Sequence, residues 1–226
     1  MNILALDTSD QVLSVALSGG NGLWYSEIDA GLRHSELLLE SIDDLFRISG
    51  LSAKDLDKIA CMKGPGSFTG LRIGFSTAKG LAMALGIPLL SLPSLDCMAY
   101  PLSAWPGLVL PAIDAKKASF FAAVYRAGKL LSDYMDAAAE KLAAELISLS
   151  LSADEQILLS GPGAELLFER ICPFLPHKMV KIDHDFRKGR AKELLEMAKS
   201  VIVNIPDDLD SGPLYIRKSD AELGTA

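Results

Sequence analysis

The sequence predicts an α/β protein made of two lobes that repeat one order of elements. Strand and helix patterns alternate along the chain of 226 residues, which is long enough for two lobes of roughly 100 residues each. The order strand, strand, strand, helix, strand, helix begins at the N-terminus and begins again near residue 107. Asp7 and Asp114 end the first strand of each series. The repetition predicts a duplicated α/β unit with a cleft between its lobes, and two unrelated α/β halves are the alternative.

The first half begins with three predicted strands, which cover residues 2–7, 12–18 and 22–28. A helix then follows from His34, with Ser35 as the expected N-cap and Gly50 at its end. Its apolar stripe consists of Leu38, Ile42 and Leu45, flanked by Leu37 and Phe46. The remaining predicted elements are a strand at 56–64, a helix that ends near Gly86, a strand at 87–92 and a helix that begins at 94.

The second half repeats this series. They are a strand at 107–115, a hairpin at 118–135, a helix at 137–149, a strand at 155–163 that enters a glycine turn, a helix at 164–175 and a last helix at 193–202. We therefore divide the chain into a first lobe of residues 1–105 and a second lobe of residues 106–226. We expect the last helix to pack back on the first lobe.

Composition excludes several classes of protein. The net charge is −7 and the pI is about 5.0, which disfavours a protein that binds nucleic acid tightly by itself. Cys61, Cys97 and Cys172 are far apart and are typical of buried thiols in a reducing compartment. The N-terminus lacks the pattern of a signal peptide, and glycine and proline interrupt the longest uncharged stretch. The sequence predicts a cytoplasmic protein.

The stretch KGPGSFTGLRIG, residues 63–74, lies between a predicted strand and a predicted helix. It lacks the lysine of a P-loop and the spacing of a dinucleotide fingerprint, so phosphate binding is the weaker interpretation. In the helix, small residues recur every four positions, namely Gly70, Gly74, Ala78 and Ala82. Such a ridge lets another helix approach closely. It either packs inside its own lobe or meets a second protein chain, with Ser67, Phe68 and Arg72 as anchors.

A second group of residues would suit a nucleotide. A carboxylate at a strand end with neighbouring hydroxyls suits Mg²⁺ and phosphate, so ATP or ADP with Mg²⁺ in the cleft between the lobes is one hypothesis. The alternative is that these residues are turn and cap residues. The candidates are Asp7, Thr8, Ser9, Asp114, Gly161 and Gly163.

Histidine and serine patterns give little support to hydrolase chemistry. The chain has His34, His177 and His184 without an H-x-x-x-H or H-E-x-x-H spacing, which disfavours a zinc hydrolase. It also lacks a G-x-S-x-G elbow. A basic cluster precedes the last helix and is either a solvated face or a contact for RNA phosphate. Its members are Arg187, Lys188, Arg190 and Lys192.

Several stretches resemble the bacterial TsaB (YeaZ) family. They are ILALDTS, RHSELLLESIDDL, KGPGSFTGLRIGFSTAKGLAMALGIPLLSLPSLD, PAIDAKK and GPLYIRKSDAE. The resemblance covers nearly the whole chain and is loosest between about residues 128 and 205. It departs at the second-lobe motif, where the family commonly has A-I-D-A-R and E-V-Y and this chain has Lys116-Lys117 and Phe120-Phe121.

The resemblance implies two actin-like lobes of the RNase H-like, or ASKHA, type, each a mixed sheet flanked by helices. It implies a subunit without catalysis of its own that joins a metal-binding TsaD-type paralogue and a TsaE-type ATPase. Together they would transfer a threonylcarbamoyl group, supplied as threonylcarbamoyl-AMP by a separate synthase, to N6 of adenosine 37. The substrates would be tRNAs that read codons beginning with A. The metal histidines of the TsaD type are absent here, because Leu38 stands four residues after His34.

The family also places the partner interface on the two first-lobe helices. The expected contacts are His34, Leu37, Leu38, Ser41, Ser67, Phe68, Thr69, Gly70, Arg72, Ile73, Gly74, Thr77, Ala78 and Leu81. The same surface would support a homodimer when the protein is alone, and tRNA would be reached through the complex. Two other classes remain open, an actin-like ATPase or kinase acting through Asp7 and Asp114, and a peptidase.

Overall fold

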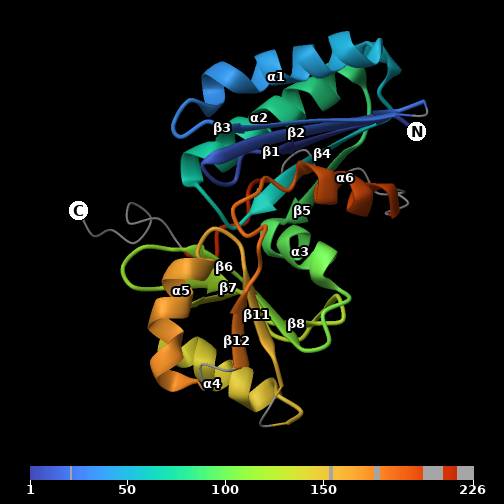
Figure 1. The fold of residues 1–226 in the computed structure, drawn as a ribbon. Helices are drawn as coiled ribbons and strands as arrows, with labels where there is room; N and C mark the ends of the chain where they lie inside the picture. Colours follow the sequence, from blue (N-terminus) through green and yellow to red (C-terminus); the bar gives the residue numbers. More distant parts are fainter. Residues whose placement is uncertain (21, 153–154, 176–178, 201–210, 218–226) are drawn as a thin grey trace. The chain divides into compact units, whose positions relative to one another are not determined.

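A computed structural model describes the chain except for residues 21, 153–154, 176–178, 201–210 and 218–226 (Figure 1). The chain divides into one unit of residues 1–97 with 188–213 and a second unit of residues 98–187 with 214–226. The first division falls eight residues earlier than the expected boundary at 105. Residues after 97 contact the second unit, as Trp105 Nε1 donates a hydrogen bond to the Gln156 carbonyl at 3.4 Å.

The sheet of the first unit has the strand order β3-β2-β1-β4-β5. Its strands are β1 (Ile3–Asp7), β2 (Val12–Gly19), β3 (Gly22–Asp29), β4 (Lys58–Gly64) and β5 (Leu89–Pro93). β1, β2 and β3 pair antiparallel, whereas β4 lies parallel to β1 and β5 parallel to β4. All five strands lie where the sequence predicts them, and the mixed sheet agrees with the predicted fold class.

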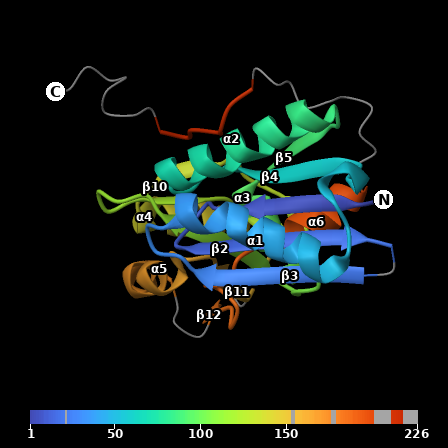
Figure 2. The same ribbon diagram turned by 90° about the horizontal axis from the view of Figure 1, so that it is seen from above.

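Helices cover both faces of this sheet. In Figure 2, α1 (His34–Ser49) and α2 (Phe68–Leu85) lie over one face, and α6 (Ala191–Ser200) lies across the other. Side chains alternate along a strand, so Leu4 and Leu6 of β1 belong to the core beneath α1 and α2, while Ile3 and Ala5 belong to the core beneath α6. The last helix therefore completes the first unit, to which residues 188–213 return.

The helix ends of the first unit follow the sequence with one correction. Gly50 and Gly86 close α1 and α2 in the left-handed conformation, with φ of 71° and 66°. Ser35 is not the N-cap of α1, because the helix already begins at His34. The Nε2 atom of His34 donates to the Asp10 carbonyl at 2.7 Å, which holds this residue in the first turn. The predicted stripe on α1 is confirmed, since Leu38, Ile42 and Leu45 are buried.

The second unit contains a sheet with the order β10-β7-β6-β11-β12, and β8 pairs with β6 and β9. Its strands are β6 (Leu108–Asp114), β7 (Phe120–Ala122), β8 (Tyr125–Arg126), β9 (Lys129–Leu130), β10 (Met135–Ala137), β11 (Ile157–Ser160) and β12 (Val180–Ile182). The predicted hairpin is present but is interrupted into two pairs, β7 with β10 and β8 with β9. α3 (Ser94–Ala99) spans the division between the units.

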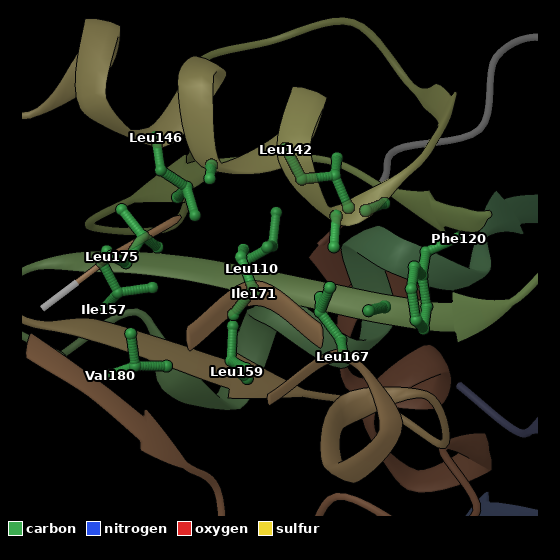
Figure 3. Packing of buried hydrophobic residues seen from close by; sticks show 14 of the residues in the cluster. Leu110, Phe120, Leu142, Leu146, Ile157, Leu159, Leu167, Ile171, Leu175 and Val180 are labelled. Atoms are coloured by element: carbon green, nitrogen blue, oxygen red, sulfur yellow. The ribbon is translucent and has the colours of Figure 1, made fainter. Parts of the chain in front are cut away.

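The core of the second unit lies between its sheet and two helices, α4 (Ala139–Leu149) and α5 (Ala164–Ile171). Figure 3 shows Leu110 of β6 and Leu159 of β11 among side chains from both helices, including Leu142 and Leu167. Each of these four residues has no exposed surface. A short helix, η3 (Cys172–Phe174), follows α5.

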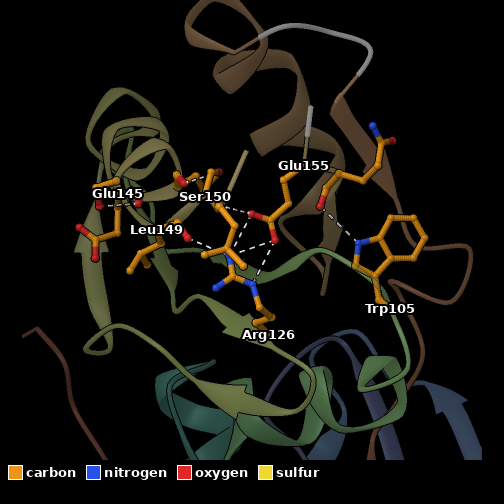
Figure 4. A network of polar contacts seen from close by, with 10 residues as sticks. Trp105, Arg126, Glu145, Leu149, Ser150 and Glu155 are labelled. Atoms are coloured by element: carbon orange, nitrogen blue, oxygen red, sulfur yellow. Dashed lines mark hydrogen bonds and ion pairs between the residues drawn. The ribbon is translucent and has the colours of Figure 1, made fainter. Parts of the chain in front are cut away.

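A polar network fixes the end of α4 (Figure 4). The guanidinium of Arg126 forms an ion pair with Glu155 at 2.9 Å and donates to the Leu149 carbonyl at 2.8 Å. Glu155 also accepts a hydrogen bond from the Leu151 backbone amide at 2.7 Å. The side chain of Glu155 is only 9% exposed, and a nearly buried carboxylate with this many donors belongs to the framework of the unit.

Candidate partner-binding surface

The expected interface residues on α1 and α2 divide into three groups by exposure. Ser67, Phe68, Thr69 and Arg72 are exposed, and Leu37, Ile73, Thr77 and Leu81 are half-buried. The buried group consists of His34, Leu38, Ser41, Gly70, Gly74 and Ala78. No buried member can contact another chain without a rearrangement of the unit, so the accessible candidates are the first two groups.

The ridge of small residues on α2 faces the interior of the first unit. A Cβ atom on Gly70 would lie 2.0 Å from the Thr8 carbonyl oxygen, and one on Gly74 would lie 2.2 Å from Thr8 Oγ1. Thr8 Oγ1 donates a hydrogen bond to the Gly70 carbonyl at 2.7 Å. Further along α2, Ala78 and Ala82 belong to the core. Of the two alternatives for this ridge, the structure supports packing inside its own lobe, because the glycines admit the chain's own turn after β1.

A stacked aromatic–arginine pair lies at the exposed start of α2. Ser67 is the N-cap and its Oγ accepts from the Gly70 amide at 3.3 Å. Phe68 is 44% exposed, and the guanidinium carbon of Arg72 lies 3.8 Å from the centre of its ring. An aromatic and an arginine stacked in this way are the residue types enriched at protein interfaces.

Other exposed apolar side chains on α1 and α2 were not predicted. They are Leu39, Ile48 and Met83, which are 57%, 63% and 66% exposed. Each lies off the buried stripe, on the polar side of an amphipathic helix; that position signals exposure but does not distinguish a contact with a partner. We define the α1–α2 surface as these three residues together with Phe68 and Arg72.

Asp7 is engaged by the chain's own atoms on both carboxylate oxygens. Oδ1 accepts from the Ser9 amide at 2.9 Å and from Ser9 Oγ at 2.6 Å. Oδ2 accepts from the Arg190 amide at 2.8 Å, directly before α6. The carboxylate thus caps the positive end of α6. Asp7, Thr8 and Ser9 are all buried, which agrees with the interpretation as turn and cap residues.

More side chains of the first unit bind the backbone at the start of α6. Ser14 Oγ accepts from the Ala191 amide at 3.0 Å, and Glu27 accepts from the Gly189 amide at 3.1 Å. The hydroxyl of Tyr25 lies 2.5 Å from the Glu27 carboxylate and 3.0 Å from the Gly189 carbonyl, and its single proton is donated to one of these acceptors at a time. Burial, and then the hydrogen bond with Glu27, raise the pKa of Tyr25 above its ordinary value. The phenol therefore remains a neutral donor at physiological pH.

The four predicted basic residues around the start of α6 differ in burial. Arg190 is 3% exposed and lies 3.6 Å from Glu193. Arg187 belongs to the second unit, where it pairs with Glu165. Lys188 and Lys192 are exposed residues of the first unit. The four residues of the predicted cluster thus differ in burial and in unit.

The second-unit candidates are also held by their own chain. Asp114 accepts from the Lys116 amide at 2.8 Å and from Lys116 Nζ at 2.7 Å. Burial raises the pKa of Asp114, but the bonds from Lys116 outweigh burial, so the pKa lies below its usual value. Gly161 has a φ of 83°, and the Gly163 amide donates to the Ala112 carbonyl at 2.8 Å. These glycines let the turn after β11 lie against the end of β6.

The described residues show neither a metal-binding cluster nor a membrane-crossing helix. Among the described residues, no group of three or more His, Cys, Asp or Glu side chains is arranged to hold a metal ion. No helix in the described part of the chain has the length and apolar character that a bilayer crossing requires.

Comparisons with known proteins define the class. A family model described as TsaD, tRNA N6-adenosine threonylcarbamoyltransferase, matches residues 28–225. A tRNA N6-adenosine threonylcarbamoyltransferase of Geotalea uraniireducens is 37% identical over 75 residues, which are 33% of this chain and 22% of that enzyme.

Two other relatives are similar over much more of their length. The tRNA threonylcarbamoyladenosine biosynthesis protein TsaB of Bacillus subtilis is 30% identical over 168 residues, which are 74% of this chain and 73% of that protein. A crystal structure from Pseudomonas aeruginosa, described as an uncharacterized protein with similarity to peptidase YeaZ, superposes with a TM-score of 0.81 and 26% identity over 96% of this chain and 99% of that one. The chain belongs to the TsaB (YeaZ) family.

Proposed function

We propose that this protein is a subunit without catalysis of its own that supports the biosynthesis of threonylcarbamoyladenosine in tRNA. In this proposal it binds a TsaD-type catalytic subunit in the cytoplasm, and the complex transfers the threonylcarbamoyl group to N6 of adenosine 37 with help from a TsaE-type ATPase. Membership of the TsaB family supports the pathway. The match to the TsaD model supports a partner of related fold.

The observation that carries the proposal is the α1–α2 surface. Three large apolar side chains and the Phe68–Arg72 pair are exposed on two helices whose other sides already pack on the sheet. Buried aromatic and arginine anchors supply most of the binding energy of protein interfaces. Phe68, Arg72 and Met83 share one face of α2, because they are spaced by 4 and 11 residues. A partner helix along that face would cover them, and a second copy of the chain would cover them in a homodimer.

The engagement of Asp7 supports a role without nucleotide chemistry in the first unit. A metal ion or a phosphate-bound metal would have to displace the Ser9 and Arg190 donors from its oxygens. Displacement would leave those donors buried and unpaired, which is unfavourable. The carboxylate therefore helps to hold α6 in place. We propose no residue of this unit for the nucleotide chemistry of the ATPase or kinase alternative.

Reconstitution tests the proposal. Threonylcarbamoyl-AMP synthase, the TsaE-type ATPase and the TsaD-type subunit from the same organism are mixed with tRNA, and modified adenosine is measured with and without this protein. We expect modification to depend on it. Phe68→Ala with Arg72→Ala should weaken binding to the TsaD-type subunit by about tenfold or more, measured by calorimetry. Met83→Glu should weaken it further, because it places a charge at the contact.

A matched control separates the surface from general effects of charge. Ile147→Glu changes a side chain of similar exposure, 59%, on α4 of the second unit. It should leave both binding and modification unchanged. Full modification in the absence of the protein would overturn the proposed function. Normal binding by the Met83→Glu and Phe68→Ala variants would instead show that the interface lies on another surface of the protein.

A further inference from the structure

A turn in the second unit has an unfavourable backbone conformation. Three consecutive residues that carry a Cβ atom have positive φ, namely Lys116 at 60°, Lys117 at 51° and Ala118 at 63°. Side chains disfavour this left-handed region, which is ordinarily occupied by single residues or by glycine. Three such residues in a row persist only where the surroundings hold them.

The turn closes on itself with a few hydrogen bonds. The Ala115 amide donates to the Ser119 carbonyl at 3.1 Å, and the Ser119 amide donates to the Lys116 carbonyl at 3.0 Å. Lys116 also bonds Asp114 through its amide and its Nζ. The Lys116 side chain is 80% exposed, and Lys117 is exposed as well. The exposed ion pair between Lys116 and Asp114 stabilises the turn only weakly.

A guanidinium from the far end of the chain holds both ends of this turn. Nη1 of Arg217 donates to the Ala115 carbonyl at 2.9 Å, and Nη2 donates to Ser119 Oγ at 2.5 Å. The same guanidinium donates hydrogen bonds to both carboxylate oxygens of Asp136 in β10, from Nε at 2.5 Å and from Nη2 at 2.7 Å. Ser119 Oγ in turn donates to Asp136 at 2.7 Å. A rigid arginine fork on a carboxylate is a strong and directional contact.

We propose that Arg217 acts as a latch. When residues 214–217 dock on the second unit, the Arg217 guanidinium holds the turn of residues 115–119 in its left-handed conformation. Undocking of this segment releases the turn and changes how Lys116 and Lys117 are presented to solvent. Arg217 acts here as a positioning residue. The latch belongs to the second unit and the α1–α2 surface to the first, and the inference does not depend on the proposed function.

Trypsin reports directly on the state of the turn. A protease needs its substrate in an extended form, so cleavage after Lys116 requires local opening, and its rate follows the population of the open form. In Arg217→Gln, we expect cleavage after Lys116 to accelerate by about tenfold or more relative to cleavage after Lys141 of α4. Peptide mass spectrometry of the full-length protein measures both sites. Ser119→Ala removes only one contact of the guanidinium and should give a smaller increase.

A rescue distinguishes a latch from a contact that merely stabilises the unit. Glycine adopts positive φ freely, so Ala118→Gly in the Arg217→Gln background should return cleavage after Lys116 to within about twofold of the original protein. Arg187→Gln removes another arginine–carboxylate pair of the same unit and should change nothing at Lys116.

Three outcomes would overturn the proposal. The first is an unchanged cleavage rate after Lys116 in Arg217→Gln. The second is an equal acceleration after Lys141, because it would assign Arg217 to the stability of the whole unit. The third is failure of Ala118→Gly to restore protection, because the latch would then not be opposing the left-handed backbone. If Arg217→Gln does not fold, the same criteria apply to Ser119→Ala.

Discussion

Two identical substitutions on α2 should have effects of opposite sign. Gly70 and Gly80 lie on the same helix, but a Cβ on Gly70 would meet the Thr8 carbonyl at 2.0 Å, whereas a Cβ on Gly80 would have no atom within 4 Å. Gly70→Ala should therefore destabilise the first unit, and Gly80→Ala should stabilise it. Because both changes add the same methyl group to the same helix, a difference in stability between the two variants reports the surroundings of each position.

The magnitudes follow from the geometry. At Gly80, replacing glycine in an exposed helix interior should raise the free energy of unfolding by about 0.5–1 kcal/mol. At Gly70, the contact must open by about 1 Å before a methyl group fits, and overpacking of this kind costs about 1–3 kcal/mol. Loss of the hydrogen bond from Thr8 Oγ1 adds about 1 kcal/mol. After the propensity gain is deducted, Gly70→Ala should lower stability by about 1–3 kcal/mol.

Urea unfolding followed by tryptophan fluorescence measures the difference. The chain has two tryptophans, and Trp24 packs against the core of the first unit. Trp105→Phe in both variants and in the reference leaves Trp24 as the reporter of that unit. The midpoint should fall in Gly70→Ala and rise in Gly80→Ala with unchanged slopes. A Gly70→Ala protein as stable as the reference would refute the inward orientation of the ridge.

Two further predictions concern buried or half-buried carboxylates. Asp7→Ala removes the acceptor of the Ser9 and Arg190 amides and should lower the free energy of unfolding by about 2–4 kcal/mol; unaltered thermal stability would contradict the capping role. Burial would raise the pKa of Asp136, but hydrogen bonds from Arg217 and Ser119 outweigh it and the pKa lies below 3.8. Because the folded state holds this carboxylate charged, the stability difference between the original protein and Asp136→Asn should be complete above pH 3.8 and shrink as the pH falls further. Denaturant titrations at pH 6 and pH 3 test this, and an equal difference at both values would contradict it.

The prediction of the partner surface shows where sequence patterns are informative. The pattern located both helices and the buried stripe of α1, because periodicity reports which residues share a face. Phe68 and Arg72, which the sequence named as anchors, lie exposed near the capped start of α2, and their contact with a partner stays a prediction. Leu39 and Met83 were not named, because a single apolar residue on a polar face looks the same whether or not a partner covers it.

The sequence by itself determined the order of strands and longer helices in the first unit, the glycine ends of α1 and α2 and the resemblance to a family; it did not predict β12 of the second unit. These features depend on neighbours in the chain, which the sequence shows directly. Only the tertiary structure decided that Gly70 and Gly74 admit Thr8, that Asp7 caps α6 and that Arg217 holds the turn at Lys116. Asp7 and Arg190 are 183 residues apart in the chain. A small residue permits close approach, and a carboxylate accepts hydrogen bonds, but neither specifies which distant group will occupy that position. That choice is made when the whole chain packs.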